Sequence, residues 1–246
     1  MRLKIIGTGS AGNAYVLENE EEALLIECGV KVSDIKKALG FDYSKVAGCI
    51  VTHEHGDHAK AINEMMNLGI EVYASKGTFE CTAPFGNHRA KPISAREQFT
   101  VGNFKIMPFE IQHDAAEPLG FLISHRDCGN VLFLTDTFYC RYRFPNLNNI
   151  IIEANYSKEI IDRKFGPESG KEFLRNRILK SHFSLENCKA MLSANDLSKV
   201  NNIVLIHLSD SNSKARQFHD EVAELTGKNV TVAENGMVIE FNKTPF

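Results

Sequence analysis

Short apolar runs rich in β-branched residues recur along the chain and predict buried strands. Such runs lie at residues 46–51, 131–134 and 203–206, and a less regular run at residues 104–112 predicts a strand bulged at Pro108. Further strands are expected at residues 1–6, 14–18, 22–27, 70–74, 97–111, 120–125, 150–154 and 230–241, and helices at residues 32–39, 59–68 and 185–194. Ser184 is placed to cap the last of these helices. Because strands and helices alternate in both halves, the pattern predicts a layered α/β domain with helices covering the sheets.

Four of the predicted strands end at a residue that can bind a metal ion. The run at 46–51 leads into a histidine cluster, and the other three runs lead to His113, Asp136 and His207. Loops anchored on a rigid sheet hold side chains in fixed positions, so binding sites are commonly built at such strand ends. Any one of these residues alone could be a structural histidine or a capping aspartate. Together, the four strand ends favour convergence on one site.

The histidine cluster at residues 52–58, Thr-His-Glu-His-Gly-Asp-His, places three imidazoles and the carboxylate of Asp57 within six positions. These groups suit zinc or a similar divalent ion better than magnesium or calcium. A helix presents zinc ligands four residues apart, whereas this spacing predicts extended or turn backbone. His53, His55 and Asp57 are spaced two residues apart and would lie on one side of an extended chain, whereas His58 would lie on the other side. This arrangement favours two coordination spheres rather than one. The alternative is an exposed polar loop, but such a concentration is rare in a chain with nine histidines.

Composition and charge fit a compact enzyme without an evident membrane or nucleic-acid signature. The 246 residues are 43% hydrophobic and 24% charged, with a formal net charge of −3. No repeat or linker is evident, so we expect one domain over residues 1–246. No apolar stretch is long enough to cross a bilayer, and no signal peptide is recognisable. The six scattered cysteines could form disulfides, but the length of the chain and the lack of a secretion signal favour reduced thiols in a cytoplasmic protein. The net charge and the lack of a long apolar stretch predict no membrane binding.

A glycine-rich segment at residues 7–12 matches the pattern G-x-G-x-x-G after a predicted strand. Alone, it would suggest dinucleotide binding, but residues 13–17 predict a second strand rather than the helix that would receive a pyrophosphate. Turn glycines between two strands are therefore the preferred interpretation. The loop could still approach the metal site, which makes Ser10 and Asn13 candidate substrate-binding residues for a phosphate.

The H-x-H-x-D-H run at residues 53–58, followed in order by His113, Asp136 and His207, resembles the metallo-β-lactamase superfamily over nearly the whole chain. Residues 9–13, 177–184 and 207–209 also resemble its small phosphodiesterase branch. That branch includes the YycJ- and WalJ-type proteins and is similar to ribonuclease Z and the PhnP-type hydrolases. The resemblance implies an αββα sandwich, the metallo-β-lactamase fold, with a dinuclear metal site between the sheets.

The resemblance also implies a role for each candidate residue. The first metal would be held by His53, His55 and His113, the second by Asp57, His58 and His207, and Asp136 would bridge the two. The ions would be two divalent metals, zinc foremost with manganese or iron as alternatives, and a hydroxide bridging them would attack the phosphodiester. Asp57 would also orient this nucleophile.

His182 precedes the predicted helix at residues 185–194 and has a separate implied role. In the ribonuclease Z-like branch, a histidine in a similar context contacts the substrate and protonates the leaving oxygen, a step that helps when the leaving group is poor. The alternative is a histidine that merely closes the loop before the helix. Ser181 stands where the family has glycine.

The segment from residue 158 to residue 180 is basic within an acidic protein. It carries seven basic and four acidic residues, a net charge of +3. One interpretation is a rim that steers phosphate backbones toward the metals. The other is a pair of solvated helices with mixed charges, interrupted by a loop at residues 166–170.

These features favour a dinuclear metal-dependent phosphodiesterase or nuclease that cleaves nucleic acid or a nucleotide. A thioester or lactone hydrolase of the same fold is the alternative, although a neutral ester would not need His182 and the basic segment. A redox di-iron protein of this fold typically has glutamate in place of His55, and a non-catalytic nucleic-acid-binding protein usually lacks some ligands. A homo-oligomer is compatible with all of these interpretations.

Overall fold

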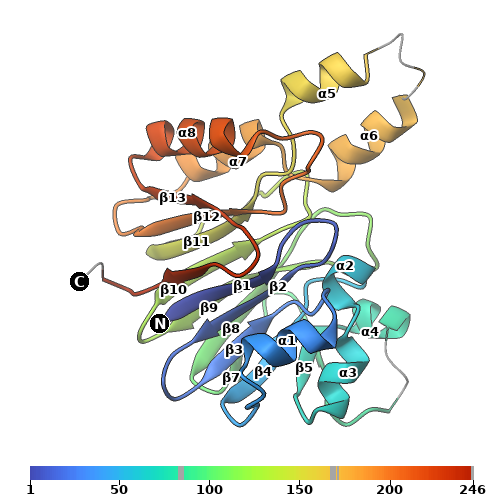
Figure 1. The fold of residues 1–246 in the computed structure, drawn as a ribbon, viewed down its shortest axis with the longest axis vertical. Coiled ribbons are helices and arrows are strands. Elements are labelled where there is room, and N and C mark those ends of the chain that lie inside the picture. The colour runs from blue at the N-terminus through green and yellow to red at the C-terminus, as the bar shows by residue number, and fades with distance from the viewer. Residues whose placement is uncertain (83–85, 167–169, 171, 245–246) are drawn as a thin grey trace.

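Two β-sheets face each other, and helices cover their outer faces (Figure 1). The structure is a computed structural model that describes residues 1–82, 86–166, 170 and 172–244. In this part of the chain, no helix is long and apolar enough to cross a membrane. The four layers confirm the predicted αββα sandwich.

The first sheet is formed mainly by the N-terminal half of the chain. Its strands are, in spatial order, β14 (Val238–Glu240), β1 (Arg2–Gly7), β2 (Ala14–Glu18), β3 (Ala23–Ile26), β4 (Val46–Ile50), β5 (Val72–Ser75) and β6 (Ala90–Ile93). Strands from β14 to β3 pair antiparallel, and those from β3 to β6 pair parallel. Its helices are α1 (Val32–Ala38), α2 (Gly56–Ala59), α3 (Ile62–Asn67) and α4 (Lys76–Thr82).

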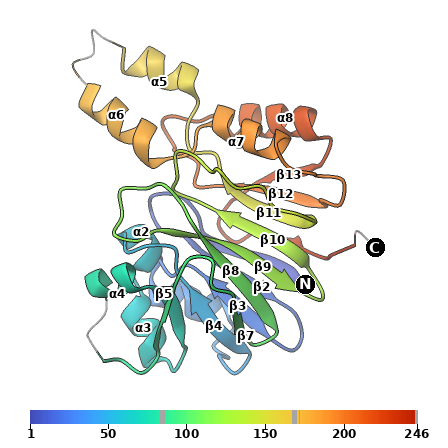
Figure 2. The same ribbon diagram turned by 180° about the vertical axis from the view of Figure 1, so that it is seen from behind.

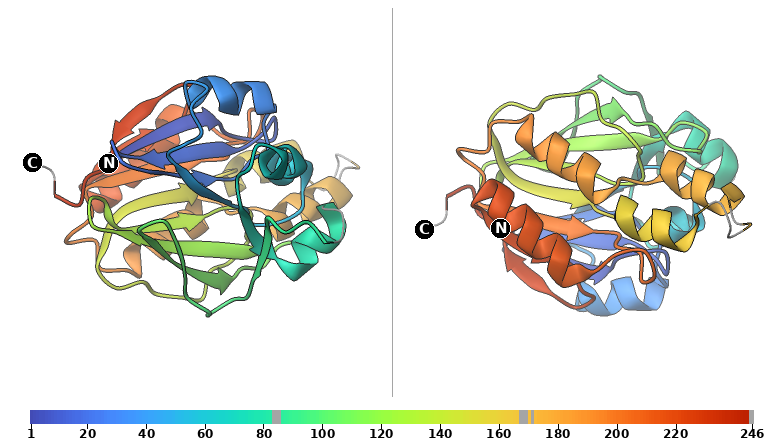
Figure 3. Two further views of the ribbon diagram at one scale, coloured as in Figure 1. Left: turned by 90° about the horizontal axis from the view of Figure 1, so that it is seen from below. Right: turned by 90° about the horizontal axis from the view of Figure 1, so that it is seen from above.

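The second sheet is formed by later strands. In spatial order these are β13 (Asn229–Val232), β12 (Asn202–Ile206), β11 (Leu147–Glu153), β10 (Gly129–Leu134), β9 (Leu119–His125), β8 (Phe104–Glu110) and β7 (Phe99–Val101). Helices α7 (Leu185–Ser193) and α8 (Ala215–Thr226) cover its outer face (Figures 2 and 3). Helices α5 (Lys158–Lys164) and α6 (Glu172–Ser181) project beyond the sandwich at one end (Figure 2).

The central strands β10, β11 and β12 of the second sheet are buried on both faces, and this explains the apolar runs in their sequences. Along β10, Val131 and Phe133 point into the core between the sheets, whereas Leu132 and Leu134 point toward the helices. In a strand, successive side chains face opposite sides, so a strand buried on both faces must be apolar at every position. A third cluster fills the space between the first sheet and helices α1 and α3.

Several local predictions are confirmed. The glycine-rich residues 7–12 form a turn between the adjacent antiparallel strands β1 and β2, as expected of turn glycines. Ser184 caps α7, because its hydroxyl accepts a hydrogen bond from the Asn187 amide at 3.1 Å. All six cysteines are free thiols.

Three local predictions are wrong. Residues 230–241 form two strands in different sheets, β13 beside β12 and β14 beside β1. Pro108 causes no bulge, because β7 pairs only with residues 104–106 and the proline therefore needs no amide proton on that side. The helix expected at residues 59–68 is broken, because the Ala61 amide donates to the Cys28 carbonyl at 2.9 Å instead of continuing α2.

Candidate metal centre

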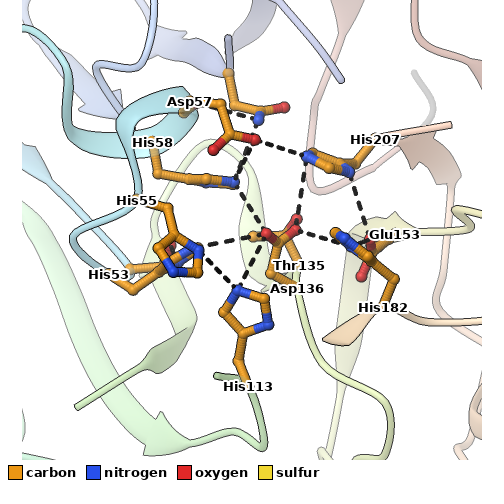
Figure 4. Close-up of polar contacts among 12 residues, drawn as sticks. His53, His55, Asp57, His58, His113, Thr135, Asp136, Glu153, His182 and His207 are labelled. Atoms are coloured by element: carbon orange, nitrogen blue, oxygen red, sulfur yellow. Dashed lines mark hydrogen bonds and ion pairs between the residues drawn. The ribbon is translucent and has the colours of Figure 1, made fainter. Parts of the chain in front are cut away.

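The predicted strand ends meet at one end of the sandwich, where seven polar side chains converge (Figure 4). The loop after β4 carries His53 and His55 in the extended or turn backbone that was predicted, but Asp57 and His58 lie on the short helix α2 instead. Strands β8, β10 and β12 of the second sheet lead to the other three residues. The converging side chains are those of His53, His55, Asp57, His58, His113, Asp136 and His207.

The first group contains three imidazoles and one carboxylate. The Nδ1 atom of His55 lies 3.1 Å from Nε2 of His53 and 3.1 Å from Nε2 of His113. The Oδ2 atom of Asp136 lies 3.6 Å from each of the latter two nitrogens. Zinc–nitrogen bonds of ~2.0–2.1 Å in a tetrahedral site would place neighbouring ligand atoms about 3.3 Å apart. The donor atoms and their spacing therefore fit a divalent metal ion.

The second group shares Asp136 with the first. Nε2 of His58 lies 3.5 Å from Oδ2 of Asp57 and 3.2 Å from Oδ2 of Asp136. Nε2 of His207 lies 3.3 Å from Oδ2 of Asp57 and 3.7 Å from Oδ1 of Asp136. Oδ2 of Asp136 faces the first group and His58, and Oδ1 faces His207. The Asp136 carboxylate is therefore shared by the two groups.

Buried partners orient the imidazoles from behind. Nδ1 of His53 lies 2.9 Å from the hydroxyl of Thr52, which donates to Glu27 at 2.5 Å. Nδ1 of His58 lies 3.3 Å from the same Glu27 carboxylate, which is fully buried. A carboxylate behind a ligating histidine fixes its ring and raises its basicity. Glu27 therefore supports both groups without facing either candidate ion.

The backbone is strained at three of these positions. Glu27, Asp136 and His207 have φ values of 63°, 46° and 56°, in the left-handed region that residues other than glycine rarely adopt. Such conformations persist only where the surroundings impose them, and they cluster at functional sites. The His207 amide, for example, is held by the hydroxyl of Thr8 at 3.0 Å.

In the first group, burial favours neutral imidazoles. It lowers the pKa of His53 well below the ordinary value, and the neighbouring His58 adds to this shift. Burial likewise lowers the pKa of His113, against the opposing charge of Asp136. A neutral imidazole is the form that binds a metal, so these two rings need no deprotonation first.

In the second group, charge outweighs burial. Burial alone would lower the pKa of both histidines, but Asp136 and Glu27 raise that of His58, and Asp136 and Asp57 help raise that of His207 to about 10. The two carboxylates are held well below their usual pKa range by the same histidines, despite their burial. A cation entering this group must therefore displace protons from its histidines.

His182 lies beside the two groups, at the end of α6. Its Nδ1 atom is 2.8 Å from Oε1 of Glu153, a fully buried carboxylate that also accepts a hydrogen bond from the Phe183 amide at 3.0 Å. Burial opposes protonation, but the charge of Glu153 outweighs it and raises the pKa of His182. With Nδ1 turned toward Glu153, Nε2 is the nitrogen left to serve as a proton donor.

A cleft of ≈ 450 Å³ opens onto these side chains. Ser10 lines it, as do Leu174, Arg177 and Ile178 of α6. Asn13 is not among the lining residues, and its carboxamide contacts the carbonyls of Gly9 and Asp57 and the amide of Gly9 at 2.9–3.2 Å. These contacts hold the loop that carries Asp57, so substrate binding by Asn13 stays a prediction.

Only part of the predicted basic rim faces this cleft. Arg177 lines it, whereas Arg175 pairs with Asp162 at 2.6 Å and Lys164 donates to Asn212 at 3.0 Å. Lys171, Glu168 and most of the predicted loop at residues 166–170 lie outside the described residues.

Glu153 and Glu27 were missed by the sequence reasoning. Each is an acid that directly follows an apolar strand sequence, Ile150-Ile151-Ile152 and Ala23-Leu24-Leu25-Ile26. The sequence therefore shows where these two acids lie relative to the strands. It does not show that they are buried, because an acid at the end of a strand is usually exposed to solvent.

Comparisons with known proteins agree with this geometry. A model of the β-lactamase superfamily domain matches residues 24–208. The exodeoxyribonuclease YycJ of Bacillus anthracis is 28% identical over 248 residues, covering 92% of this chain and 90% of that protein. The exodeoxyribonuclease WalJ of Streptococcus pneumoniae is 26% identical, covering 98% and 92%. The metallo-β-lactamase fold protein YhfI from Bacillus subtilis superposes with a TM-score of 0.72 at 17% identity, covering 97% and 98%.

Proposed function

This chain belongs to the β-lactamase superfamily, and from that premise we propose that it is a metal-dependent phosphodiesterase that cleaves nucleic acid. The observation that carries the proposal is a protonatable histidine, His182, held by buried Glu153 beside two groups of metal-binding side chains. Hydrolysis of a phosphodiester needs both charge stabilisation and a proton for a poor leaving group. Similarity over most of the chain to two exodeoxyribonucleases supports the same reaction class.

We propose two ions, each with its own ligands. The first set is His53, His55 and His113, the second is Asp57, His58 and His207, and Asp136 is shared. Zinc suits this mixture of imidazole and carboxylate, while manganese or iron are alternatives. When bound, the ions would polarise the phosphodiester and lower the pKa of the attacking water. One chain supplies all seven donors within one domain over residues 1–246, so the site does not require a homo-oligomer.

The protein's own groups then have separate tasks. Asp57 is ionised at neutral pH and lies on the open side of the second group, where it can orient the attacking water as well as hold an ion. His182 gives the proton on Nε2 to the departing oxygen, while Glu153 keeps the ring in place. Arg177 and Ser10, at the cleft wall, can bind the phosphate.

The free cysteines fit a reducing compartment, so the proposal includes a cytoplasmic location.

A substrate panel tests the proposal. Purified protein, reconstituted with zinc or manganese and analysed for metal content, is offered single- and double-stranded DNA, RNA, a cyclic nucleotide and a thioester. We expect metal-dependent cleavage of a nucleic acid, lost in His55→Ala and retained in His219→Ala, a change on helix α8. Hydrolysis of the thioester alone would replace the proposal by the thioester hydrolase alternative.

A further inference from the structure

The segment that follows Asp136 carries alternating aromatic and basic residues. Residues 138–144, which we call the strap, read Phe-Tyr-Cys-Arg-Tyr-Arg-Phe and lie between β10 and β11 without helix or strand structure. Burial alternates along most of the strap in the manner of an extended chain. It therefore has one face toward the protein and another toward solvent.

The inward face packs against the core of the second sheet. Cys140, Tyr142 and Phe144 contact the cluster between this sheet and its helices, and the ring of Phe144 lies 4.8 Å from that of Phe109. The outward face consists of Tyr139, which is 54% exposed, and two exposed arginines. Apolar packing thus fixes the strap while its aromatic and basic groups remain accessible.

Hydrogen bonds hold both ends of the strap. The Phe138 amide donates to the Gln112 carbonyl at 3.2 Å, and its carbonyl accepts from the Asn187 side chain at 2.8 Å. At the other end, the Phe144 amide donates to the Asn195 side chain at 2.7 Å. Gln112 directly precedes the candidate ligand His113, so the strap begins at the metal centre.

A groove of ≈ 290 Å³ runs between the strap and helix α7. Phe183, Ala190, Met191 and Ala194 line it together with strap residues 139–143. Phe183, in one wall of the groove, directly follows His182 in the chain, so that wall is one residue away from the residue that would protonate the leaving group. Its combination of apolar walls and a basic edge suits a chain of bases joined by phosphates.

The charge of the strap is uncompensated. Within the described part of the chain, neither Arg141 nor Arg143 has a carboxylate within 4.0 Å. The Arg141 guanidinium donates to the Tyr142 hydroxyl at 2.9 Å and lies 5.1 Å from the centre of its ring. The neighbouring carboxylate of Glu110 is already engaged by Arg96 at 3.0 Å and by the Tyr142 hydroxyl. Two guanidinium groups on the exposed face of the strap are therefore available to bind an anion.

We propose that the strap and its groove bind the single-stranded part of a nucleic-acid substrate next to the cleaved bond. Tyr139 stacks on a base, and Arg141 and Arg143 contact phosphates. This inference rests on the proposed function and narrows its substrate class to a strand longer than one nucleotide. Stacking and charge serve DNA and RNA alike, so both strands are probes in the test.

Binding is measured by fluorescence anisotropy on the zinc-loaded protein, with 12-mer single strands of DNA and of RNA whose phosphorothioate linkages resist cleavage. Loss of one stacking platform usually costs ~1–3 kcal/mol per base, so Tyr139→Ala should weaken binding at least about fivefold. Each phosphate contact contributes about 0.7 to the slope of log affinity against log salt for single strands. The double variant Arg141→Ala/Arg143→Ala should therefore flatten this slope by about 1.4.

The matched control is Lys37→Ala/Arg216→Ala, which removes the same charge at exposed positions on α1 and α8. It should leave affinity and slope near the wild-type values. Strap variants that bind like this control would overturn the inference, whatever the protein cleaves. Failure of the wild-type protein to cleave any phosphodiester would instead defeat the proposed function, and the salt slope would still decide the role of the strap.

Discussion

Replacing His182 with alanine should slow cleavage of natural phosphodiesters while leaving the metal centre in place. The imidazole is held by a 2.8 Å contact between Nδ1 and the buried Glu153 carboxylate, which leaves Nε2 to deliver a proton. Its nearest contact with a proposed ligand carboxylate is 3.9 Å, to Oδ1 of Asp136. The variant should therefore lose proton donation and keep its metal ions.

The size of the effect should depend on the leaving group. Assistance by a general acid typically contributes about 10²–10⁴-fold to the rate, which corresponds to ~3–5 kcal/mol of transition-state stabilisation. His182→Ala should lose this factor on DNA or RNA, whose alkoxide leaves only with a proton. A bis(4-nitrophenyl) phosphate diester should suffer much less, because nitrophenolate departs unprotonated.

The second half of the test uses Glu153→Gln, which keeps the shape of the side chain and removes its charge. Glu153 raises the pKa of His182 through its charge and its hydrogen bond, so removing that charge should lower this pKa. Because Glu153 raises this pKa in the parent protein, the acid form survives to higher pH there. The alkaline limb of the pH–rate profile on nucleic acid should therefore move to lower pH in the variant.

The assay is kcat against pH on both substrate types, with metal content measured for every variant. Oε1 of Glu153 also lies 3.4 Å from Nδ1 of His207, a proposed ligand of the second ion. Metal analysis is therefore essential, because Glu153→Gln could change metal binding as well as the pKa of His182. His219→Ala, on α8, is the control and should match the wild-type profile. Equal losses on the nucleic acid and the nitrophenyl diester, or loss of one metal ion in His182→Ala, would refute the role of His182 as the acid.

Three further predictions concern the metal centre and the loop that carries it. Asp136→Ala and His55→Ala should abolish hydrolysis while circular dichroism stays that of the parent, and wild-type turnover in both, with contaminating metal controlled, would contradict the proposed site. Because burial is outweighed by charge at His58 and His207, the metal-free protein holds protons on these rings, and the pKa of His207 is raised to about 10. Zinc binding should therefore release protons and tighten from pH 6 to 8 by about tenfold per pH unit for each proton released. Calorimetry in buffers of different ionisation enthalpy should detect this release, and pH-independent binding would rule it out. A Cβ on Gly29 would lie 1.7 Å from the Asp57 carbonyl oxygen, whereas one on Gly56 would meet nothing within 4 Å. Gly29→Ala should therefore lose ~1–3 kcal/mol of stability and melt at a lower temperature than the parent protein. Gly56→Ala should melt like the parent. Equal melting temperatures for the two variants in thermal melts would mean that the segment carrying Asp57 can shift without cost.

The strand ends were predictable because the information is local. An apolar run of four to six residues that leads to His53, Asp136 or His207 can be read without knowing which strands pair. The same locality explains the error at residues 230–241, where the pattern indicates strand but cannot show that β13 and β14 join different sheets. Strand content is a property of a short segment, whereas sheet membership depends on contacts with distant residues.

Glu153 and the strap could not be recognised for the same reason. Glu153 gains its meaning from His182, which is 29 residues away in sequence, and from the fully buried position that keeps its charge unscreened. The strap resembles an ordinary loop until Phe144 is seen in the core and Asn187 is seen holding its first residue. In both cases the sequence shows which chemical groups are present, but not which distant residues they contact.

The division of ligands between the two sheets connects the fold to the chemistry. His53 and His55 lie on the loop after β4 of the first sheet and Asp57 and His58 on the short helix α2 that follows it, whereas His113, Asp136 and His207 come from the second sheet. Each proposed ion therefore takes donors from both sheets, and neither group can form before the sheets pack. Because binding to the folded state alone adds to its stability, ions held in this way would also tie the two layers together. The left-handed backbone at Asp136 and His207 is consistent with this arrangement, since its strain is tolerable only where packing and ligation together over-determine the conformation.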